Sequence, residues 1–136
     1  MTELAAVAAT ALFLAMAGFQ VVLALGAPIG EHVLGGRYPG VLSGRLRLFS
    51  AIAAVILVGA ALVTLARAGV IGWLPGAAGL LAPATWVIAG FLALNTLGNL
   101  TSKSRFERTV FAAVTAVLAI LCAYVALTGG RSTGHG

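Results

Sequence analysis

Charged side chains are scarce in this sequence, and their scarcity excludes a water-soluble domain. Of the 136 residues, 8% are charged and 61% are hydrophobic, and aspartate is absent altogether. Soluble domains contain about 25% charged and about 45–50% apolar residues. A chain with so few charges cannot cover a surface that faces water, so we expect lipid to surround most of it.

Cysteine and histidine are almost absent as well. Cys122 is the single cysteine, which excludes an internal disulfide and CxxC redox chemistry, and we expect it to be a small buried hydrophobe. The two histidines, His32 and His135, are predicted on opposite sides of the membrane, and a metal site needs three or four ligands. The glycines match neither GxGxxG nor a Walker loop. We therefore expect no metal and no other cofactor.

The net charge of +5 comes from eight Lys and Arg residues against three glutamates. These cations lie between apolar runs, and there is no basic face with interleaved aromatics, so we expect no nucleic-acid partner. Topology signalling and contact with anionic headgroups explain the basic excess better.

Four apolar runs are each long enough to cross a bilayer, which takes about 20 residues as a helix. They are continuously apolar rather than alternating, which favours helices over a barrel. Glu3, the lack of an N-terminal cation and the length of the first run predict a retained helix rather than a signal peptide. We predict an all-α, transmembrane antiparallel four-helix bundle over residues 1–128, with a flexible polar tail over 129–136. The expected spans are about 4–25, 46–66, 84–100 and 106–127.

The segment Val70–Ala82 is apolar but broken by glycine and proline, so it predicts an interfacial turn or a short surface helix. Pro83 suits the first turn of the third helix, where a missing N–H costs nothing. Trp73 and Trp86 flank this region and indicate one membrane interface.

The distribution of cations predicts the orientation, because positive loops stay in the cytoplasm. The first and third loops and their edges hold six cations, against Arg67 and Arg131 on the other side. We expect both termini outside. The six cations are Arg37, Arg45, Arg47, Lys103, Arg105 and Arg108.

Small residues recur at helical spacing in all four runs and predict close helix packing. An alanine-rich chain also produces such stripes by chance. The predicted stripes are Ala112, Ala116, Ala119, Ala123 and Ala126 in the fourth run; Ala8, Ala11, Ala15 and Gly18 in the first; Ala51, Ala54, Val58 and Ala61 in the second; Gly90 and Ala93 in the third.

Polar residues gather where the third run ends. Asn95 and Asn99 are four residues apart and share one helix face, which predicts either a notch for a polar ligand or headgroup, or hydrogen bonds between helices. Gln20 in the first run predicts a hydrogen bond to another helix. Ser104 and Glu107 fit a capping box, which starts the fourth helix near Arg105 and gives Glu107 a structural role.

The first loop combines six glycines with basic residues. Glycine permits close backbone approach and free N–H groups, and arginine binds phosphate, so an anionic headgroup is a candidate guest. The alternative is a loop that follows the membrane surface, its glycines serving only as turns. Glu31 and His32 are the weak catalytic candidates of this loop. The candidate ligand-binding residues are Gly30, Gly35, Gly36, Arg37, Arg47, Asn95, Asn99 and Arg105.

Two motifs combine glycine and polar residues within the apolar background. Leu25 to Gly30 followed by Gly35–Gly36 reads LGAPxGxxxxGG, and Asn95 to Glu107 reads NTxxNLxSxSxxE. On these motifs the sequence resembles a family of small, largely uncharacterised bacterial four-helix integral membrane proteins. The resemblance implies the four-span architecture and directs attention to the first and third loops, without implying an activity.

Three functions follow from these patterns. The first is a membrane module that binds lipid, a partner membrane protein or a second copy of the chain. The second is an enzyme acting on a lipid or another apolar substrate, which needs a cavity holding Glu31 or His32 with Asn95 or Asn99. The third is an oligomeric small transporter or channel, which the lack of a central charge in any span disfavours. In each case the expected location is the bacterial cytoplasmic (inner) membrane.

Overall fold

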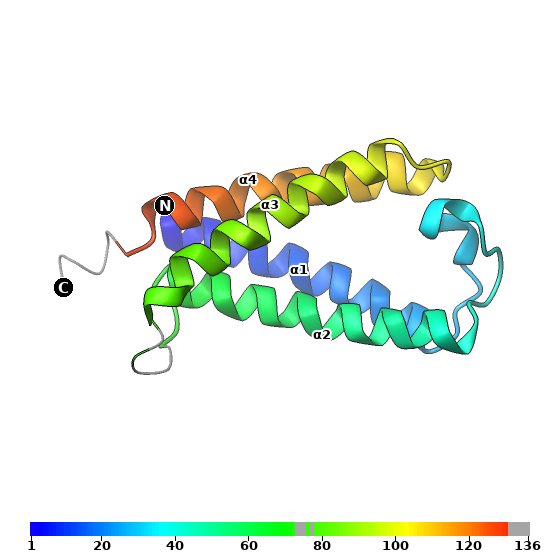
Figure 1. Cartoon of the computed structure of the whole chain (residues 1–136), viewed down its shortest axis with the longest axis horizontal. Helices are drawn as coiled ribbons and strands as arrows, with labels where there is room; N and C mark the ends of the chain where they lie inside the picture. Colours follow the sequence, from blue (N-terminus) through cyan, green and yellow to red (C-terminus); the bar gives the residue numbers. More distant parts are fainter. Residues whose placement is uncertain (73–75, 77, 131–136) are drawn as a thin grey trace.

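The chain forms four antiparallel helices, shown in a computed structural model that describes residues 1–72, 76 and 78–130 (Figure 1). The described residues contain no strand, so the predicted all-α four-helix bundle is confirmed. The amino terminus and the carboxyl end of the last helix, at Thr2 and Thr128, lie at one end of the bundle. The first and third loops, residues 25–43 and 101–104, meet at the opposite end, which we call the loop end. The helices are α1 Thr2–Ala24, α2 Gly44–Arg67, α3 Leu81–Leu100 and α4 Ala112–Thr128.

All four helices are long and apolar enough to span a membrane. Counted with the helical turns that lead into them, they contain 22 to 24 residues each. Large apolar side chains point away from the bundle on every helix, among them Val55, Val87 and Ile120. Such an outer surface suits lipid, and the chain is a multi-pass membrane protein.

A narrow core runs along the bundle axis and joins all four helices. Phe13 of α1, Ala61 of α2, Leu92 of α3 and Leu118 of α4 meet there and are almost entirely buried. Cys122 is fully buried beside Thr64, as expected for a small hydrophobe. Since lipid tails are as apolar as these side chains, close packing rather than water exclusion holds the helices together.

The predicted small-residue stripes are right in part. In α4 none of the five alanines is exposed: Ala112 and Ala126 are buried, and Ala116, Ala119 and Ala123 are half-buried. The most deeply buried positions of α4 are nevertheless Thr115, Leu118, Cys122 and Val125, because larger side chains gain more dispersion contacts when they fill the core. The exposed members of the other predicted stripes are Ala8, Ala11, Ala15, Gly18, Ala51, Val58, Gly90 and Ala93, whereas Ala54 and Ala61 are buried.

Threonine hydroxyls, rather than amides, link the helices. The Thr96 hydroxyl of α3 donates to the Thr115 hydroxyl of α4, with 2.8 Å between the two oxygens. The hydroxyl oxygens of Thr2 and Thr128 are hydrogen-bonded at 2.7 Å. The predicted interhelical hydrogen bond of Gln20 is wrong, because its side chain makes none within the described residues. Gln20 instead faces a cavity.

Two arginines of α2 satisfy the carboxyl ends of neighbouring helices. Arg47 Nε donates to the carbonyl of Ala24 at 2.9 Å, and Arg67 donates to the carbonyl of Ala126 at 2.8 Å. A cation at a helix carboxyl end binds orphan carbonyls and opposes the negative end of the helix dipole. Each end of α2 is thereby tied to an adjacent helix.

The connection before α3 contains a short 3₁₀ turn, Ala78–Leu80, which continues directly into α3. Pro83 lies in the first turn of α3, as predicted. Trp86 is about half-exposed on the outer surface. Trp73 and part of the predicted interfacial turn lie outside the described residues, as does most of the predicted flexible tail.

We expect Leu118→Ala to destabilise the protein far more than Ile120→Ala, although both remove the same number of carbons from α4. Leu118 is fully buried, whereas Ile120 is 69% exposed to lipid. The buried site should lose about 2–3 kcal/mol of unfolding free energy through its cavity. The unfolding free energy of both variants can be measured by adding a denaturing detergent to protein in mild micelles. Equal losses of unfolding free energy in the two variants would contradict the burial of Leu118 in the core.

Candidate functional site

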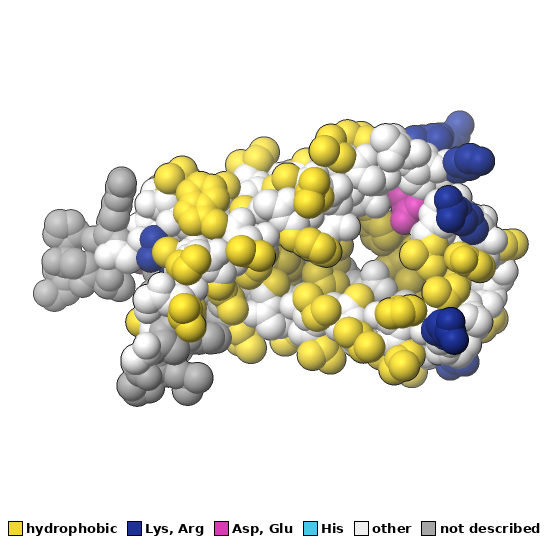
Figure 2. All heavy atoms as spheres, in the orientation of Figure 1, with side chains coloured by type: hydrophobic (Ala, Val, Ile, Leu, Met, Phe, Trp, Pro, Cys, Tyr) yellow, Lys and Arg dark blue, Asp and Glu magenta, His cyan; other side chains and the backbone are white. Residues whose placement is uncertain are grey.

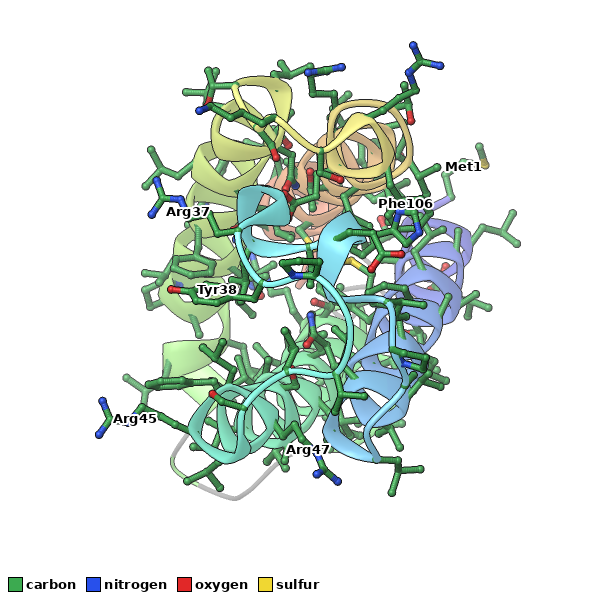
Figure 3. The ribbon with its side chains drawn as sticks, turned by 90° about the vertical axis from the view of Figure 1, so that its right-hand side faces the viewer. Met1, Arg37, Tyr38, Arg45, Arg47 and Phe106 are labelled. Carbon is green, nitrogen blue, oxygen red and sulfur yellow. The ribbon has the colours of Figure 1, made fainter. Side chains whose placement is uncertain are left out.

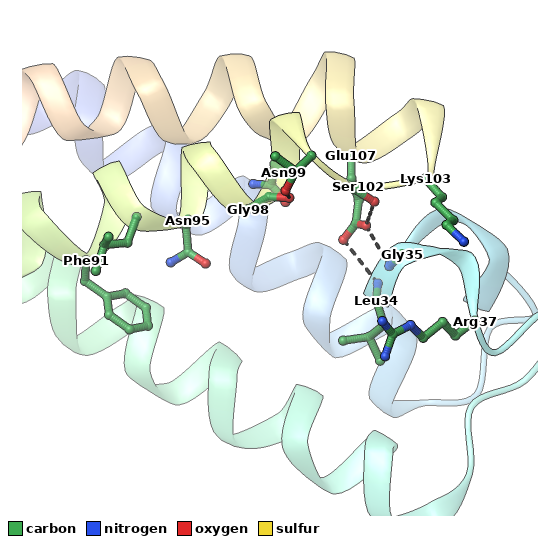
Figure 4. A pocket seen from close by; sticks show the side chains of 12 residues that line it. Leu34, Gly35, Arg37, Phe91, Asn95, Gly98, Asn99, Ser102, Lys103 and Glu107 are labelled. Carbon is green, nitrogen blue, oxygen red and sulfur yellow. Dashed lines mark hydrogen bonds between the residues drawn. The ribbon is translucent and has the colours of Figure 1, made fainter.

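Glu107 joins the first loop to the turn between α3 and α4. Its carboxylate accepts the backbone N–H groups of Leu34, at 3.1 Å, and Gly35, at 2.9 Å, and also the hydroxyl of Ser102 (Figure 4). Ser104 adds a further link, because its hydroxyl donates to the carbonyl of His32 at 3.0 Å. The two loops, far apart in sequence, are thus bound to each other.

The predicted capping box is wrong in its second half. Ser104 Oγ accepts the N–H of Glu107 at 3.4 Å, as an N-cap does, and helical structure begins at Arg105. The Glu107 carboxylate, however, does not return to the N–H of Ser104, which donates to Ser102 Oγ instead. Two free N–H groups on the first loop compete for the carboxylate and bind it.

The helix is irregular where Glu107 lies. Residues Glu107–Phe111 form a π-helical segment that leads into α4. Such segments are rare, and they frequently occur at functional sites because the wider turn re-aims the side chains. Here the irregularity coincides with the residue that holds the first loop.

The first loop is compact because of its own contacts. Gly30 donates its N–H to the carbonyl of Gly40 at 2.8 Å, and a Cβ on Gly30 would overlap the carbonyl oxygen of Tyr38, so only glycine fits. Glu31 accepts the N–H of Gly40, and the backbone N–H groups of Glu31 and Gly40 hold the pKa of the Glu31 carboxyl below its ordinary value.

An aromatic cluster supports the other side of the loop. Phe19 of α1 stacks on Phe106 at 5.6 Å and meets Phe111 edge-on at 5.0 Å, measured between ring centroids. The ring of His32 lies against Phe106 at 5.6 Å. These contacts place the loop over the end of the bundle.

An outer cavity of about 540 Å³ opens between the first loop and the end of α3 (Figure 4). Asn95, Gly98 and Asn99 line it from α3, and the Glu107 carboxylate lies at its inner side. Arg37 and Lys103 stand at its mouth and carry positive charge. It therefore combines amide donors with two cations.

The outer cavity continues into a larger apolar one of about 700 Å³ between α2 and α3. Leu34, Phe91, Asn95, Asn99 and Glu107 line both. Figure 2 shows the molecule hollowed here, with an acidic side chain at the edge of the hollow and cations clustered at the loop end. The inner walls come from α1 and α4, for example Met16 and Thr115.

The side-chain amides of Asn95 and Asn99 make no hydrogen bond within the described residues. Asn95 is exposed and Asn99 half-buried, and both lie on the cavity face of a membrane-spanning helix. Polar groups in lipid need partners, so two unbonded amides beside a cavity are available to a ligand. The hydrogen bond between α3 and α4 comes from Thr96 instead.

The candidate residues from the sequence fall into two groups. Gly35, Arg37, Asn95 and Asn99 meet at the outer cavity. The other four line neither cavity. Gly30 is buried inside the first loop, and Gly36 turns the backbone there with φ +76°. Arg47 donates to the carboxyl end of α1 and lies against Gly26, and Arg105 is exposed.

Glu31 and His32 do not reach either cavity. Their side chains are each 48% exposed and lie 3.6 Å apart at the loop end, outside the cavity linings. Among the described residues, no three His, Cys, Asp or Glu side chains are close enough to share a metal ion. Glu107 is therefore the acidic residue that lines the two cavities beside Asn95 and Asn99.

Sequence reasoning missed Ser102, Lys103 and Phe91 as cavity residues and gave Glu107 only a local role. The signal for Glu107 was its rarity, since it is one of three acidic residues in the chain. No signal marks Phe91, because a phenylalanine in an apolar span is unremarkable until the helices are placed.

Comparison with known proteins adds no relative: no family model, no curated protein and no solved structure matches this chain.

We expect Glu107→Ala to release the first loop from α4. Hydrogen bonds to a charged acceptor contribute about 1.5–3 kcal/mol each, so the amides of Leu34 and Gly35 should exchange with solvent about 10- to 100-fold faster. Hydrogen exchange measured in detergent or nanodiscs tests this. Glu31→Ala is the control, because the Glu31 carboxylate accepts the N–H of Gly40 in the same loop and not that of Leu34 or Gly35. Unchanged exchange at Leu34 and Gly35 would contradict the role of Glu107.

Proposed function

We propose that the protein is a membrane module that binds an anionic membrane lipid, with the headgroup in the outer cavity. The observation that supports this most is the lining of that cavity, which contains two unbonded amides, Asn95 and Asn99, and two cations, Arg37 and Lys103. Phosphate-bearing headgroups need hydrogen-bond donors and positive charge, and this lining supplies both.

The charge balance at the loop end favours an anionic guest. Glu107 carries the nearby negative charge, and its two oxygens are occupied by two backbone N–H groups and a hydroxyl. Arg37 and Lys103 have no acidic partner within 4 Å among the described residues. Each cation near an anionic membrane surface contributes about 1 kcal/mol.

The proposed orientation puts the loop end in the cytoplasm of a bacterial inner membrane, with both termini outside. Six of the eight Lys and Arg residues belong to the loop end, where Figure 2 shows them clustered. Positive loops remain cytoplasmic during insertion. The headgroup would then come from the cytoplasmic leaflet, where anionic lipids give a negative surface potential.

A reporter at the carboxyl terminus tests the orientation. We expect a periplasm-dependent phosphatase fused after Gly136 to be active and a cytoplasm-dependent fluorescent protein at the same place to be dark. Fusions made after Ser43, in the first loop, should give the opposite pattern. A fluorescent and phosphatase-negative carboxyl terminus would contradict the orientation.

Native mass spectrometry of the full chain in mild detergent tests the lipid. We expect phosphatidylglycerol to bind at least several-fold more tightly than phosphatidylcholine. Arg37→Ala with Lys103→Ala should weaken phosphatidylglycerol by about 5- to 30-fold, since it removes two cations from the cavity mouth.

Arg45→Ala is the control, because Arg45 lies at the same end (Figure 3) but lines neither cavity. Equal binding of the two lipids, or equal loss with Arg45→Ala and the double variant, would contradict the proposal.

A further inference from the structure

We infer that the apolar cavity between α2 and α3 holds one hydrocarbon chain of the bound lipid, and that the chain reaches it sideways from the bilayer. The inference rests on the proposed function for the identity of the headgroup. It adds which part of the lipid lies inside the protein and by which route it arrives.

The two cavities are continuous, so one amphiphilic molecule can occupy both. Asn95, Asn99 and Glu107 form the polar boundary between them, and Leu34 and Phe91 complete the junction. Beyond this boundary the lining is mostly apolar, with Met16, Ile56 and Ile88 among its members, and its polar side chains are Gln20, Ser50 and Thr115. The arrangement is polar at the loop end and apolar toward the bundle centre, as a lipid is.

The apolar cavity is open to the bilayer along the gap between α2 and α3. Figure 1 shows these two helices diverging toward the loop end, while α1 lies along α2 and α4 along α3. Phe49 and Ile56 on one side of the gap are 59% and 62% exposed. Val87 and Phe91 on the other side are 70% and 65% exposed, so apolar side chains flank the opening.

The depth of the cavity matches one leaflet. Its α3 wall runs from Val87 to Asn99, which is about 18 Å of helix at about 1.5 Å per residue. Half of the hydrocarbon core of a bilayer is about 15 Å. A chain whose headgroup lies at the loop end would therefore end near the bilayer centre, beside Val87 at the inner end of the cavity.

Water fits the cavity less well. Gln20, Ser50 and Thr115 are the polar side chains of the inner lining, and three of them are too few to hold water throughout the cavity. A single hydrocarbon chain is narrow enough and is always present at the opening.

Filling the cavity tests the inference. Ala53 is half-buried on the cavity face of α2, whereas Ala51 is exposed and outside the cavity. We expect Ala53→Phe to weaken phosphatidylglycerol binding at least 5-fold by native mass spectrometry, and Ala51→Phe to leave it unchanged. Equal binding by Ala53→Phe and the unaltered protein would overturn the inference.

A headgroup without chains, together with the two sets of variants, separates this inference from the headgroup proposal. Glycerophosphoglycerol, which has the headgroup and no chains, should bind at least 10-fold more weakly than phosphatidylglycerol. If Arg37→Ala weakens phosphatidylglycerol while Ala53→Phe does not, the headgroup site stands and the chain site fails. If phosphatidylglycerol and phosphatidylcholine bind equally in every variant, the proposed function fails.

A photo-reactive lipid decides the question on the unaltered protein, even where Ala53→Phe does not fold. Phosphatidylglycerol with a diazirine at mid-chain should label α2 and α3 at the gap, near Ile56, Val87 and Phe91. Labelling spread evenly over the outer faces of all four helices, including Ile120, would overturn the inference.

Discussion

The carboxylate of Glu107 organises the loop end by accepting the N–H groups of Leu34 and Gly35. A charge this close to the membrane needs partners, and a glycine-rich loop supplies N–H groups that a helix cannot spare. These two hydrogen bonds hold the first loop across the end of the bundle. The loop then forms the outer wall of the cavity that Asn95 and Asn99 line. Without this contact the cavity would be an open end between helices.

The second constraint is that lipid is the solvent. Apolar side chains gain little from leaving lipid for the protein interior, so the bundle has no strong drive to close every gap between its helices. Hydroxyl pairs such as Thr96–Thr115 and the two arginine contacts of α2 tie particular neighbours together. Nothing comparable joins α2 to α3 at the loop end among the described residues, and there the apolar cavity opens. In water such a surface would collapse, whereas in a bilayer a lipid chain can fill it.

The sequence predicted the fold because the apolar runs exceed the membrane thickness and the turns are rich in glycine and proline. It predicted the core faces poorly, because alanine is so frequent that a stripe at helical spacing does not identify the buried side. It brought together Gly35, Arg37, Asn95 and Asn99, which meet at one cavity. It could not find the contact of Glu107 with Leu34 and Gly35, since local capping chemistry explained that residue without any distant partner. Phe91 and the gap beside it depend on how the helices diverge, which periodicity does not encode.

The most direct test of this account is the distance between the Glu107 carboxyl carbon and the amide nitrogens of Leu34 and Gly35 in a lipid bilayer. Solid-state NMR on a sample with carbon-13 in glutamate and nitrogen-15 in leucine and glycine measures it through dipolar transfer. The account predicts strong transfer from the Glu107 carboxyl to both nitrogens, and its loss in Glu107→Ala. Absence of that transfer, in a sample where the Glu31 carboxyl still shows transfer to the Gly40 nitrogen, would contradict the account.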